Sequence, residues 1–172
     1  MQLKDGFQQM PLKGEPKDSI YEEVDALFLD IDNDGDKDLV IATGGNEYQL
    51  TSEFSKVLTY LNKGDYLEKS NTHFTDIALV ASCIRVADID GDGFQDIFLG
   101  GRVVPRTYGN IPNSYFLINN GKGNFVDKTS QYLESPNALG FVKDAQFFDW
   151  NKDEKPDLLV CLLYTSPSPR DS

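Results

Sequence analysis

The chain has 172 residues, which is enough for one domain with a sizeable core. Its 28 acidic residues against 16 Lys and Arg give a formal net charge of −12, and this acidity argues against nucleic acid as a partner, because a phosphate backbone needs a basic surface. Hydrophobic residues make up 40% of the chain, which excludes a disordered acidic tail. We also find no apolar run of membrane-spanning length and no apolar segment of a signal peptide in the first residues.

Two strand-forming segments flank an acidic loop in the first predicted element, LFLDIDNDGDKDLVIATGG at residues 27–45. The loop places five aspartates within nine residues, and like charges at that density oppose compaction unless something offsets them. The same plan returns at residues 84–101, IRVADIDGDGFQDIFLGG, and at residues 145–160, AQFFDWNKDEKPDLLV. The sequence therefore contains three copies of a strand, acidic loop and strand.

A second repeated signal lies between these elements. Residues 60–70, YLNKGDYLEKS, and residues 116–130, FLINNGKGNFVDKTS, are each apolar, then rich in Asn and Gly, then aromatic. This order is typical of a β-hairpin, whose turn needs the positive φ that glycine adopts readily. The three acidic loops begin at spacings of 58 and 61 residues, with Asp30, Asp88 and Asp149.

The repeating unit is therefore about 60 residues long. A unit of this size holds roughly four strands of five to six residues with their turns. Because one such unit cannot bury both of its faces, neighbouring copies must stack, and radial stacking of four-stranded units makes a β-propeller. We predict an all-β fold, a partial β-propeller of about two to three four-stranded blades cut from a larger ring, since propellers typically have four to eight blades.

The first acidic loop, residues 30–38, has the spacing of a calcium site when its positions are numbered from Asp30. Ca²⁺ prefers six to eight oxygen ligands, and side chains at positions one, three, five and nine with the carbonyl at position seven would provide at least five. Glycine at position six allows the sharp turn, and Ile31 at position two is expected to point into the core. The predicted metal ligands of this loop are Asp30, Asp32, Asp34, Asp36 and Asp38.

The second loop, residues 88–96, matches the same pattern, whereas the third, residues 149–157, departs from it. Glu154 stands at position six of the third loop, where a glycine is expected, so we expect weaker or altered metal binding there. The predicted ligands of these two loops are Asp88, Asp90, Asp92, the Phe94 carbonyl and Asp96, and Asp149, Asn151, Asp153, the Lys155 carbonyl and Asp157.

An EF-hand, a magnesium site and a zinc site each fit the loops less well than a calcium site of this pattern. An EF-hand has Glu at position twelve and flanking helices, but here position twelve is Ile41, Leu99 or Val160 within a predicted strand. Mg²⁺ tends to keep its waters, and zinc prefers His and Cys ligands, which the loops lack. A solvated acidic turn without metal remains the alternative, and the recurrence of the pattern in register weighs against it.

The Asp-x-Asp-x-Asp-Gly-x-x-Asp loops and the segment FLGGRVVP at residues 98–105 resemble the FG-GAP/VCBS repeat family, whose calcium-binding β-propeller repeats also occur in integrin α-subunit heads. Together with VIATGGNEY at residues 40–48, they are most similar to bacterial surface proteins related to cartilage acidic protein. The resemblance covers residues 3–160. It implies that each loop joins two strands of a blade and binds Ca²⁺ through the positions given above.

Two classes of function remain open. The first is a calcium-stabilised binding or adhesion module that presents loops to a protein or polysaccharide partner. The second is an accessory propeller of a larger secreted carbohydrate-active enzyme whose catalytic part lies elsewhere. We expect no catalytic residue in this segment, because carboxylates committed to calcium do not titrate near neutrality. Calcium at extracellular concentrations suits such loops, which predicts a location at the cell surface, outside the cell or in the periplasm.

Several side chains beyond the acidic loops are candidates for a function. His73 lies in the polar stretch KSNTHFTD and is predicted to be an exposed loop residue, and Cys83 lies in an apolar strand pattern and is predicted to be a buried, inert thiol. Arg102 and Arg106 flank the loop GRVVPRTYGNIPNSY, and with Tyr108 and Tyr115 they could form a binding surface, although an ordinary connection between blades is favoured.

The last twelve residues, CLLYTSPSPRDS at 161–172, are similar to the translation of a common sequencing adaptor. We therefore expect residues 1–160 to be a fragment of one propeller domain and residues 161–172 to be a non-native tail. A natural terminus rich in Ser and Pro is the alternative.

Overall fold

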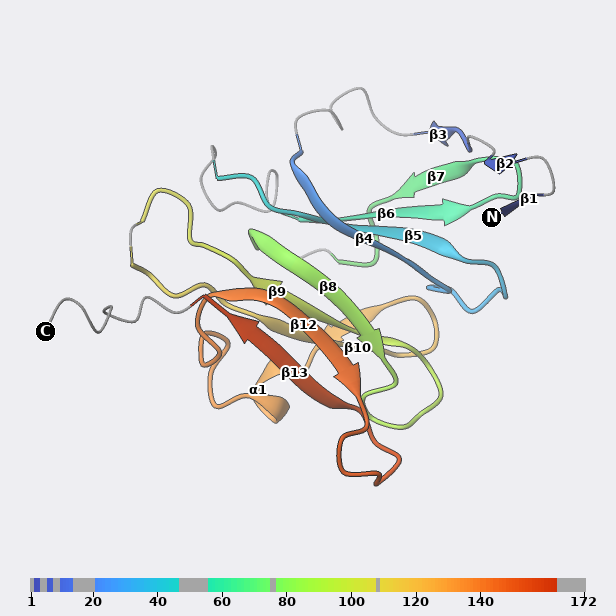
Figure 1. Ribbon diagram of the computed structural model, residues 1–172. Helices are drawn as coiled ribbons and strands as arrows, with labels where there is room; N and C mark the ends of the chain where they lie inside the picture. The colour runs from blue at the N-terminus through green and yellow to red at the C-terminus, as the bar shows by residue number, and fades with distance from the viewer. Residues whose placement is uncertain are drawn as a thin grey trace, which may run out of the picture.

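The protein is nearly all β in the computed structural model, which describes residues 10–13, 21–46, 56–74, 77–107 and 109–163 and the backbone of residues 2–3 and 6–7 (Figure 1). In chain order the elements are β1 (Gln2–Leu3), β2 (Gly6–Phe7), β3 (Leu12–Lys13), β4 (Glu23–Leu29), β5 (Asp38–Thr43), β6 (Val57–Asn62), β7 (Leu67–Ser70), β8 (Ala81–Ala87), β9 (Asp96–Gly101), β10 (Tyr115–Asn119), β11 (Phe125–Asp127), α1 (Thr129–Tyr132), β12 (Val142–Phe148) and β13 (Asp157–Leu162). Within the described part, no helix has the length and apolar character needed to cross a membrane.

Three sheets follow one another along the chain, and we call them the first, second and third blades. The first has the order β3-β7-β6-β5-β4, the second β11-β10-β9-β8, and the third β12-β13, while β1 and β2 form a separate short ladder. Strands β4 to β7 and β8 to β11 are each joined by consecutive antiparallel pairings, and β3 adds to the first blade in parallel with β7. The predicted all-β partial propeller is confirmed, with two strands of the third blade described.

The three blades repeat the same irregularity, which supports their equivalence. The first strand of each blade is antiparallel to the second, and its register shifts by a bulge near its beginning. The bulges lie between Glu23 and Asp25, between Ala81 and Cys83, and between Val142 and Asp144.

Two apolar cores hold the blades together. The first includes Leu29 and Val40 of the first blade with Ile84 and Leu99 of the second. The second core packs Cys83, Phe98 and Phe116 of the second blade against Val142 and Ala145 of the third. Strand β9 is buried along its whole length because the second blade has a neighbour on each face. Its continuous apolar run therefore reflects packing on both faces.

The third blade includes part of the predicted tail. Strand β13 continues past Val160 and ends at Leu162, and Cys161 and Leu162 pair with Asp144 and Val142 of β12. Cys161 is exposed, whereas Cys83 is buried as predicted, and burial raises the pKa of the Cys83 thiol. Residues 164–172 of the predicted tail lie outside the described residues, as does Tyr108.

Arg85 of β8 links all three blades through polar contacts. Its guanidinium forms ion pairs with Asp25 of β4 and with Asp144 of β12. Its Nε also donates to the Ala145 carbonyl at 2.6 Å, and the backbone N–H of Ile84 donates to the Asp25 carboxylate at 3.1 Å. A single side chain thereby orients the first strands of the three blades, a role that suits the planar, five-donor guanidinium.

Replacing Arg85 with Ala should lower the free energy of unfolding by about 1 to 2 kcal/mol, because two carboxylates and a carbonyl lose a charged donor in a partly exposed position. Urea denaturation of the metal-free protein measures this change. Lys143→Ala is the matched control, since it removes the same charge from an exposed side chain next to Asp144. Equal losses in the two variants would contradict a linking role for Arg85.

Candidate metal centre

The three acidic loops have the same backbone conformation, in which positions four and six are left-handed. The φ angles at these positions are 61° at Asn33 and 92° at Gly35, 81° at Gly91 and 92° at Gly93, and 63° at Lys152 and 65° at Glu154. Glycine adopts this region without cost, so the first two loops satisfy the turn more easily than the third.

The aspartate at position one closes each loop by accepting backbone hydrogen bonds. The N–H at position six donates to its Oδ2 atom, at 3.0 Å from Gly35, 3.0 Å from Gly93 and 2.9 Å from Glu154. Such side-chain to backbone bonds favour a tight turn over a regular strand. The first aspartate therefore shapes the loop in addition to offering an oxygen to a cation.

The aspartate at position nine ties the loop to the strands. Asp38 accepts hydrogen bonds from the N–H of Ile31 at 2.9 Å and from the N–H of Asn62, at the end of β6, at 2.8 Å. Asp96 accepts the equivalent bonds from Ile89 and from Asn119, at the end of β10, both at 2.8 Å. These two carboxylates are only 1% and 0% exposed.

Burial dominates the electrostatics of the position-nine aspartates. It raises the pKa of Asp38 and of Asp96 above the ordinary value of 3.8, although the two backbone N–H donors at each carboxylate oppose the shift. Neighbouring loop aspartates, Asp32 and Asp34 for Asp38 and Asp90 for Asp96, raise the pKa further by repulsion. A bound cation would remove this cost by compensating the buried negative charge.

Positions one, three and nine converge in the first two loops. The carboxylates of Asp30, Asp32 and Asp38 each offer an oxygen, and these oxygens lie within 4.8 Å of one another. Asp88, Asp90 and Asp96 form the equivalent group in the second loop. All donors are carboxylate oxygens, which suits a hard divalent cation such as Ca²⁺ or Mg²⁺.

An unpartnered atom in the first group supports its fit to a cation. Asp32 Oδ1 is buried and has no hydrogen-bond partner in the described structure. The loop is covered there by the β10–β11 turn of the second blade, because a Cβ placed on Gly123 would lie 3.3 Å from the Ile31 carbonyl oxygen and 3.4 Å from Asp32 Cα. A buried carboxylate oxygen without a donor is costly unless a ligand satisfies it.

Two further predicted ligand positions have contacts of a different kind. At position five, Asp34 and Asp92 lie outside the two close groups, and each accepts a hydrogen bond of 2.9 Å from the N–H at position seven, which belongs to Asp36 or Phe94. The same bond, at 3.0 Å, joins Lys155 to Asp153 in the third loop. The side chain at position five thus fixes the backbone N–H of the residue whose own carbonyl is the predicted ligand at position seven.

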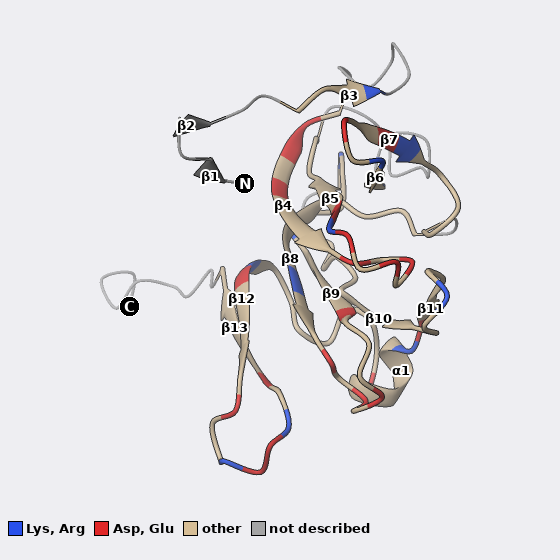
Figure 2. Cartoon of the chain, turned by 90° about the vertical axis from the view of Figure 1, so that its right-hand side faces the viewer, with Lys and Arg blue, Asp and Glu red and all other residues tan. Residues whose placement is uncertain are grey.

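The third loop differs from the first two in chemistry and exposure. Of positions one, three and nine, only the first and last carry carboxylates, from Asp149 and Asp157, because position three is Asn151. The Asn151 side-chain amide donates to Asp153 at 3.1 Å. The residue at position two is Trp150, which is 78% exposed, whereas Ile31 is buried as predicted. The loop projects away from the sheets and carries lysines between its acids (Figure 2).

His73 does not lie exposed as predicted. It is half-buried, and its Nδ1 forms a short hydrogen bond with the Gly123 carbonyl, so that the proton is on Nδ1. Its Nε2 is buried without a partner in the described structure. The sequence contained no signal for this position, because the contact joins two blades and its partners are separated by 50 residues.

Sequence reasoning also missed Asn62 and Asn119. Each begins an Asn-x-Gly turn, and its side chain accepts from the glycine N–H, at 2.9 Å from Gly64 and 3.0 Å from Gly121. Each side-chain amide also donates to the carbonyl at loop position eight, from Asn62 at 3.2 Å and from Asn119 at 3.4 Å. The repeated Asn-x-Gly signature could have identified these residues as part of the loop's support.

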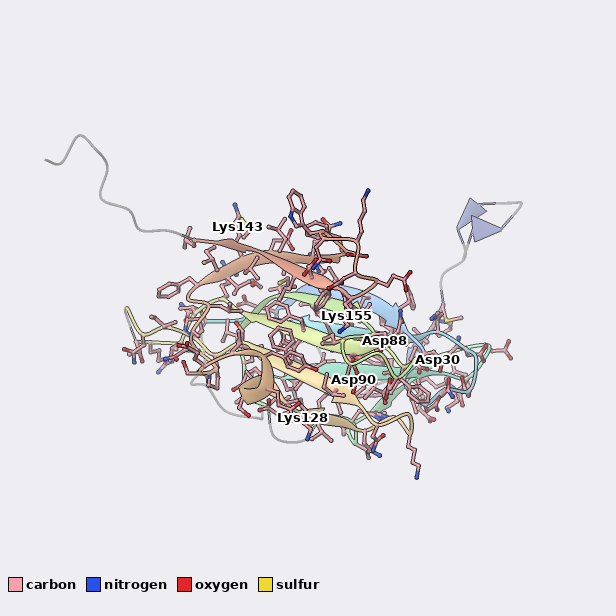
Figure 3. All side chains as sticks on the ribbon, turned by 90° about the horizontal axis from the view of Figure 1, so that it is seen from below. Asp30, Asp88, Asp90, Lys128, Lys143 and Lys155 are labelled. Atoms are coloured by element: carbon pink, nitrogen blue, oxygen red, sulfur yellow. The ribbon has the colours of Figure 1, made fainter. Side chains whose placement is uncertain are left out.

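The labelled aspartates Asp30, Asp88 and Asp90 lie toward one end of the sheets, and Lys143 lies toward the other (Figure 3). A cavity of about 450 Å³ opens near Lys143, where the first strands of the three blades begin. Its lining includes Val24, Ser82, Arg102 and Lys143. The acidic loops and this cavity are therefore at opposite ends of the strands.

Comparison with known proteins agrees with the repeat. Residues 30–99 match the family model described as an FG-GAP-like repeat. This segment begins at the first aspartate of the first loop and ends within β9, so it contains both close groups of carboxylates. No curated protein and no solved structure matches the chain. The match supports an FG-GAP repeat and, with the blades, defines a β-propeller-like repeat module.

The buried carboxylate at position nine makes the metal-free protein sensitive to pH. Because the pKa of Asp38 is raised by folding, its contribution to stability is present below 3.8 and is lost as the pH rises through the raised pKa. In chelator, raising the pH from about 4 to 7 should therefore lower the free energy of unfolding of the wild type relative to that of Asp38→Asn. Urea denaturation at each pH measures it. Asp65→Asn, at an exposed turn, is the control for removal of one charge, and a flat result for Asp38→Asn would contradict the assignment.

The strained position in the third loop gives a separate prediction. Glu154→Gly should raise the free energy of unfolding by about 1 kcal/mol, because glycine removes the cost of the left-handed conformation. Glu154→Gln is the control, since it removes the same charge and keeps the strain. Thermal unfolding in chelator compares the two variants, and an equal gain in both would assign the effect to charge.

Proposed function

We propose that the protein is a calcium-binding repeat module of a surface or secreted protein, in which the metal stabilises the blades and another surface binds a protein or polysaccharide partner. The observation that carries the proposal is the convergence of three carboxylates in each of two equivalent loops, one of which holds an unpartnered buried oxygen. FG-GAP repeats are typically binding modules without catalytic activity, and residues 30–99 match that family.

Calcium is the cation that the donor set favours. It accepts six to eight oxygens in flexible geometry, so carboxylates at positions one, three and nine, with the position-seven carbonyl and water, form a suitable shell. Mg²⁺ demands a smaller octahedral arrangement and keeps more of its waters. Such a site, at millimolar or lower calcium, suits a protein exposed to the extracellular medium or the periplasm. The third loop is proposed as a weaker site.

The position of the loops argues for a structural role of the metal. Residues 30–38 are covered by the β10–β11 turn of the next blade, so that a bound ion would brace two blades against each other. We propose that the partner binds at the opposite end of the strands. The cavity there is lined by Arg102 and Lys143, two basic side chains in a protein that is acidic overall. We assign this function to residues 1–160, and Leu163 of the predicted tail also lines the cavity.

Calorimetric titration with Ca²⁺, paired with thermal unfolding in calcium and in chelator, tests the proposal. We expect two to three ions to bind, two of them through the first two loops, and the melting temperature to rise by several degrees, since a ligand that binds only the folded state stabilises it by mass action. A folded protein that ignores calcium in both measurements would rule out the metal.

Variants at position three assign the effect to the loops. Asp32→Ala and Asp90→Ala should each remove one calcium site and lower stability by about 1 to 3 kcal/mol in calcium, with little change in chelator. Asp65→Ala removes the same charge from an exposed turn and is the matched control. Equal losses in calcium and in chelator would mean that these carboxylates serve the metal-free fold.

A further inference from the structure

The β-bulges of the three blades each direct one side chain into a common cavity. The shifted register of the first strands skips Val24, Ser82 and Lys143, which are therefore the bulged residues. All three line the cavity of about 450 Å³, which lies at the end of the strands away from the acidic loops (Figure 3). A bulge re-aims the side chain of its extra residue and is common beside functional sites. One irregularity, repeated in three blades, thus builds the cavity.

Arg102 reaches the same cavity from the residue that follows the second strand of its blade. Its backbone N–H donates to the Val80 carbonyl at 2.9 Å, and in the first blade the N–H of Gly44 makes the equivalent bond with Glu22 at 2.8 Å. A Cβ placed on Gly44 would lie 2.3 Å from a Val24 side-chain atom, so a side chain there would displace its neighbour. The backbone contact is common to both blades, whereas the cation is specific to the second.

Arg102 and Lys143 are both unpaired cations. The ion pairs of the first strands belong to Arg85, and neither Arg102 nor Lys143 has a carboxylate partner among the described residues. No carboxylate lines the described part of the cavity either. In a chain with a net charge of −12, two unpaired cations at one cavity favour an anionic ligand.

The uncharged lining of the cavity favours an aliphatic group beside that anion. Apart from Ser82, the described uncharged lining consists of Val24, Phe141, Val142 and Leu163. The Ser82 hydroxyl already donates to the Gly100 carbonyl at 3.2 Å. The several hydroxyls of a sugar ring would need more polar partners than this wall offers, because a polar group that is buried without a hydrogen bond is costly.

We infer that this cavity binds the C-terminal carboxylate of a partner protein whose last residue is aliphatic. The inference rests on the proposed function, since it specifies the chemistry of the partner at the end of the strands assigned there to partner binding. The carboxylate lies between Arg102 and Lys143, and the last side chain packs on Val24 and Phe141. The planar guanidinium can hold both carboxylate oxygens, which adds a direction to the attraction.

Ligand-observed NMR with the full chain in calcium tests the inference. The probe is the peptide acetyl-Gly-Ser-Gly-Leu with a free C-terminus, and its matched control is the same peptide with a C-terminal carboxamide. We expect saturable binding of the free acid. The carboxamide should bind about tenfold more weakly or less, because it keeps the leucine side chain and loses the charged acceptor.

Variants of the two cations locate the binding. Arg102→Gln and Lys143→Gln should each weaken binding of the free acid by about fivefold or more and leave the carboxamide unchanged. Arg102→Lys should retain part of the binding, since the charge stays while the two-donor geometry is lost. Lys122→Gln is the matched control, because it removes the same charge from an exposed residue of the β10–β11 turn.

Several outcomes would overturn the inference. Absence of peptide binding, equal binding of the two peptides, or an equal loss with Lys122→Gln would each exclude a carboxylate site at this cavity. Binding of a galacturonate oligosaccharide that Arg102→Gln weakens, with no binding of the peptide, would assign the cavity to an acidic polysaccharide instead.

The ligand and the metal can fail separately. Calcium binding without peptide binding would leave the proposed metal sites intact and exclude this ligand. Peptide binding by a chain that ignores calcium would support this ligand and exclude the metal, because the peptide reports on the cavity and calorimetry reports on the loops.

Discussion

The buried aspartate at loop position nine is the contact on which the rest of the structure depends. Asp38 and Asp96 join an acidic loop, the strand that leaves it and the third strand of the same blade through two backbone N–H donors each. A carboxylate at this depth is costly, and its neighbours are further carboxylates. One side chain in each of these two blades therefore ties the third strand to the loop and also belongs to the group of carboxylates that could hold a cation.

The attractive contacts that hold the blades together and the repulsion among the loop carboxylates lie in different parts of the protein. Apolar cores and the Arg85 contacts join the blades along their length, and the acidic loops lie beyond the ends of the first strands. Repulsion among the loop carboxylates thus acts at one end of each blade, away from the cores. The exception is the first loop, which is covered by the turn at Gly123 of the second blade. The negative charge of this loop therefore lies at a contact between two blades.

Much of the fold could be predicted from the sequence, because its signals repeat. The spacing of Asp30, Asp88 and Asp149 indicated the unit length, and the alternation of apolar runs with Asn- and Gly-rich turns indicated the hairpins. The burial of Ile31 followed from its place at loop position two, and the burial of Cys83 followed from its place in an apolar segment. These features depend on residues close together in the chain, where periodicity is informative.

Features that depend on distant segments could not be predicted. The half-buried state of His73 results from a turn 50 residues away. The backbone N–H groups that donate to Asp38 and Asp96 belong to asparagines 24 and 23 residues further along the chain. The exposure of Trp150 was also unforeseen, since position two is buried in the first loop. The roles of individual aspartates within a loop likewise depend on which oxygen faces a backbone donor, which spacing does not encode.

The left-handed pair at loop positions four and six has a consequence for how such repeats diverge. The pair is present at Lys152 and Glu154 even though neither residue favours it and the third loop has Asn151 where the other two loops have an aspartate. The path of the chain has therefore changed less among the copies than the chemistry it displays. After duplication, a unit can replace a loop carboxylate and still keep the turn between its first two strands. Each copy is then free to drift toward a new surface while the arc around it keeps its shape.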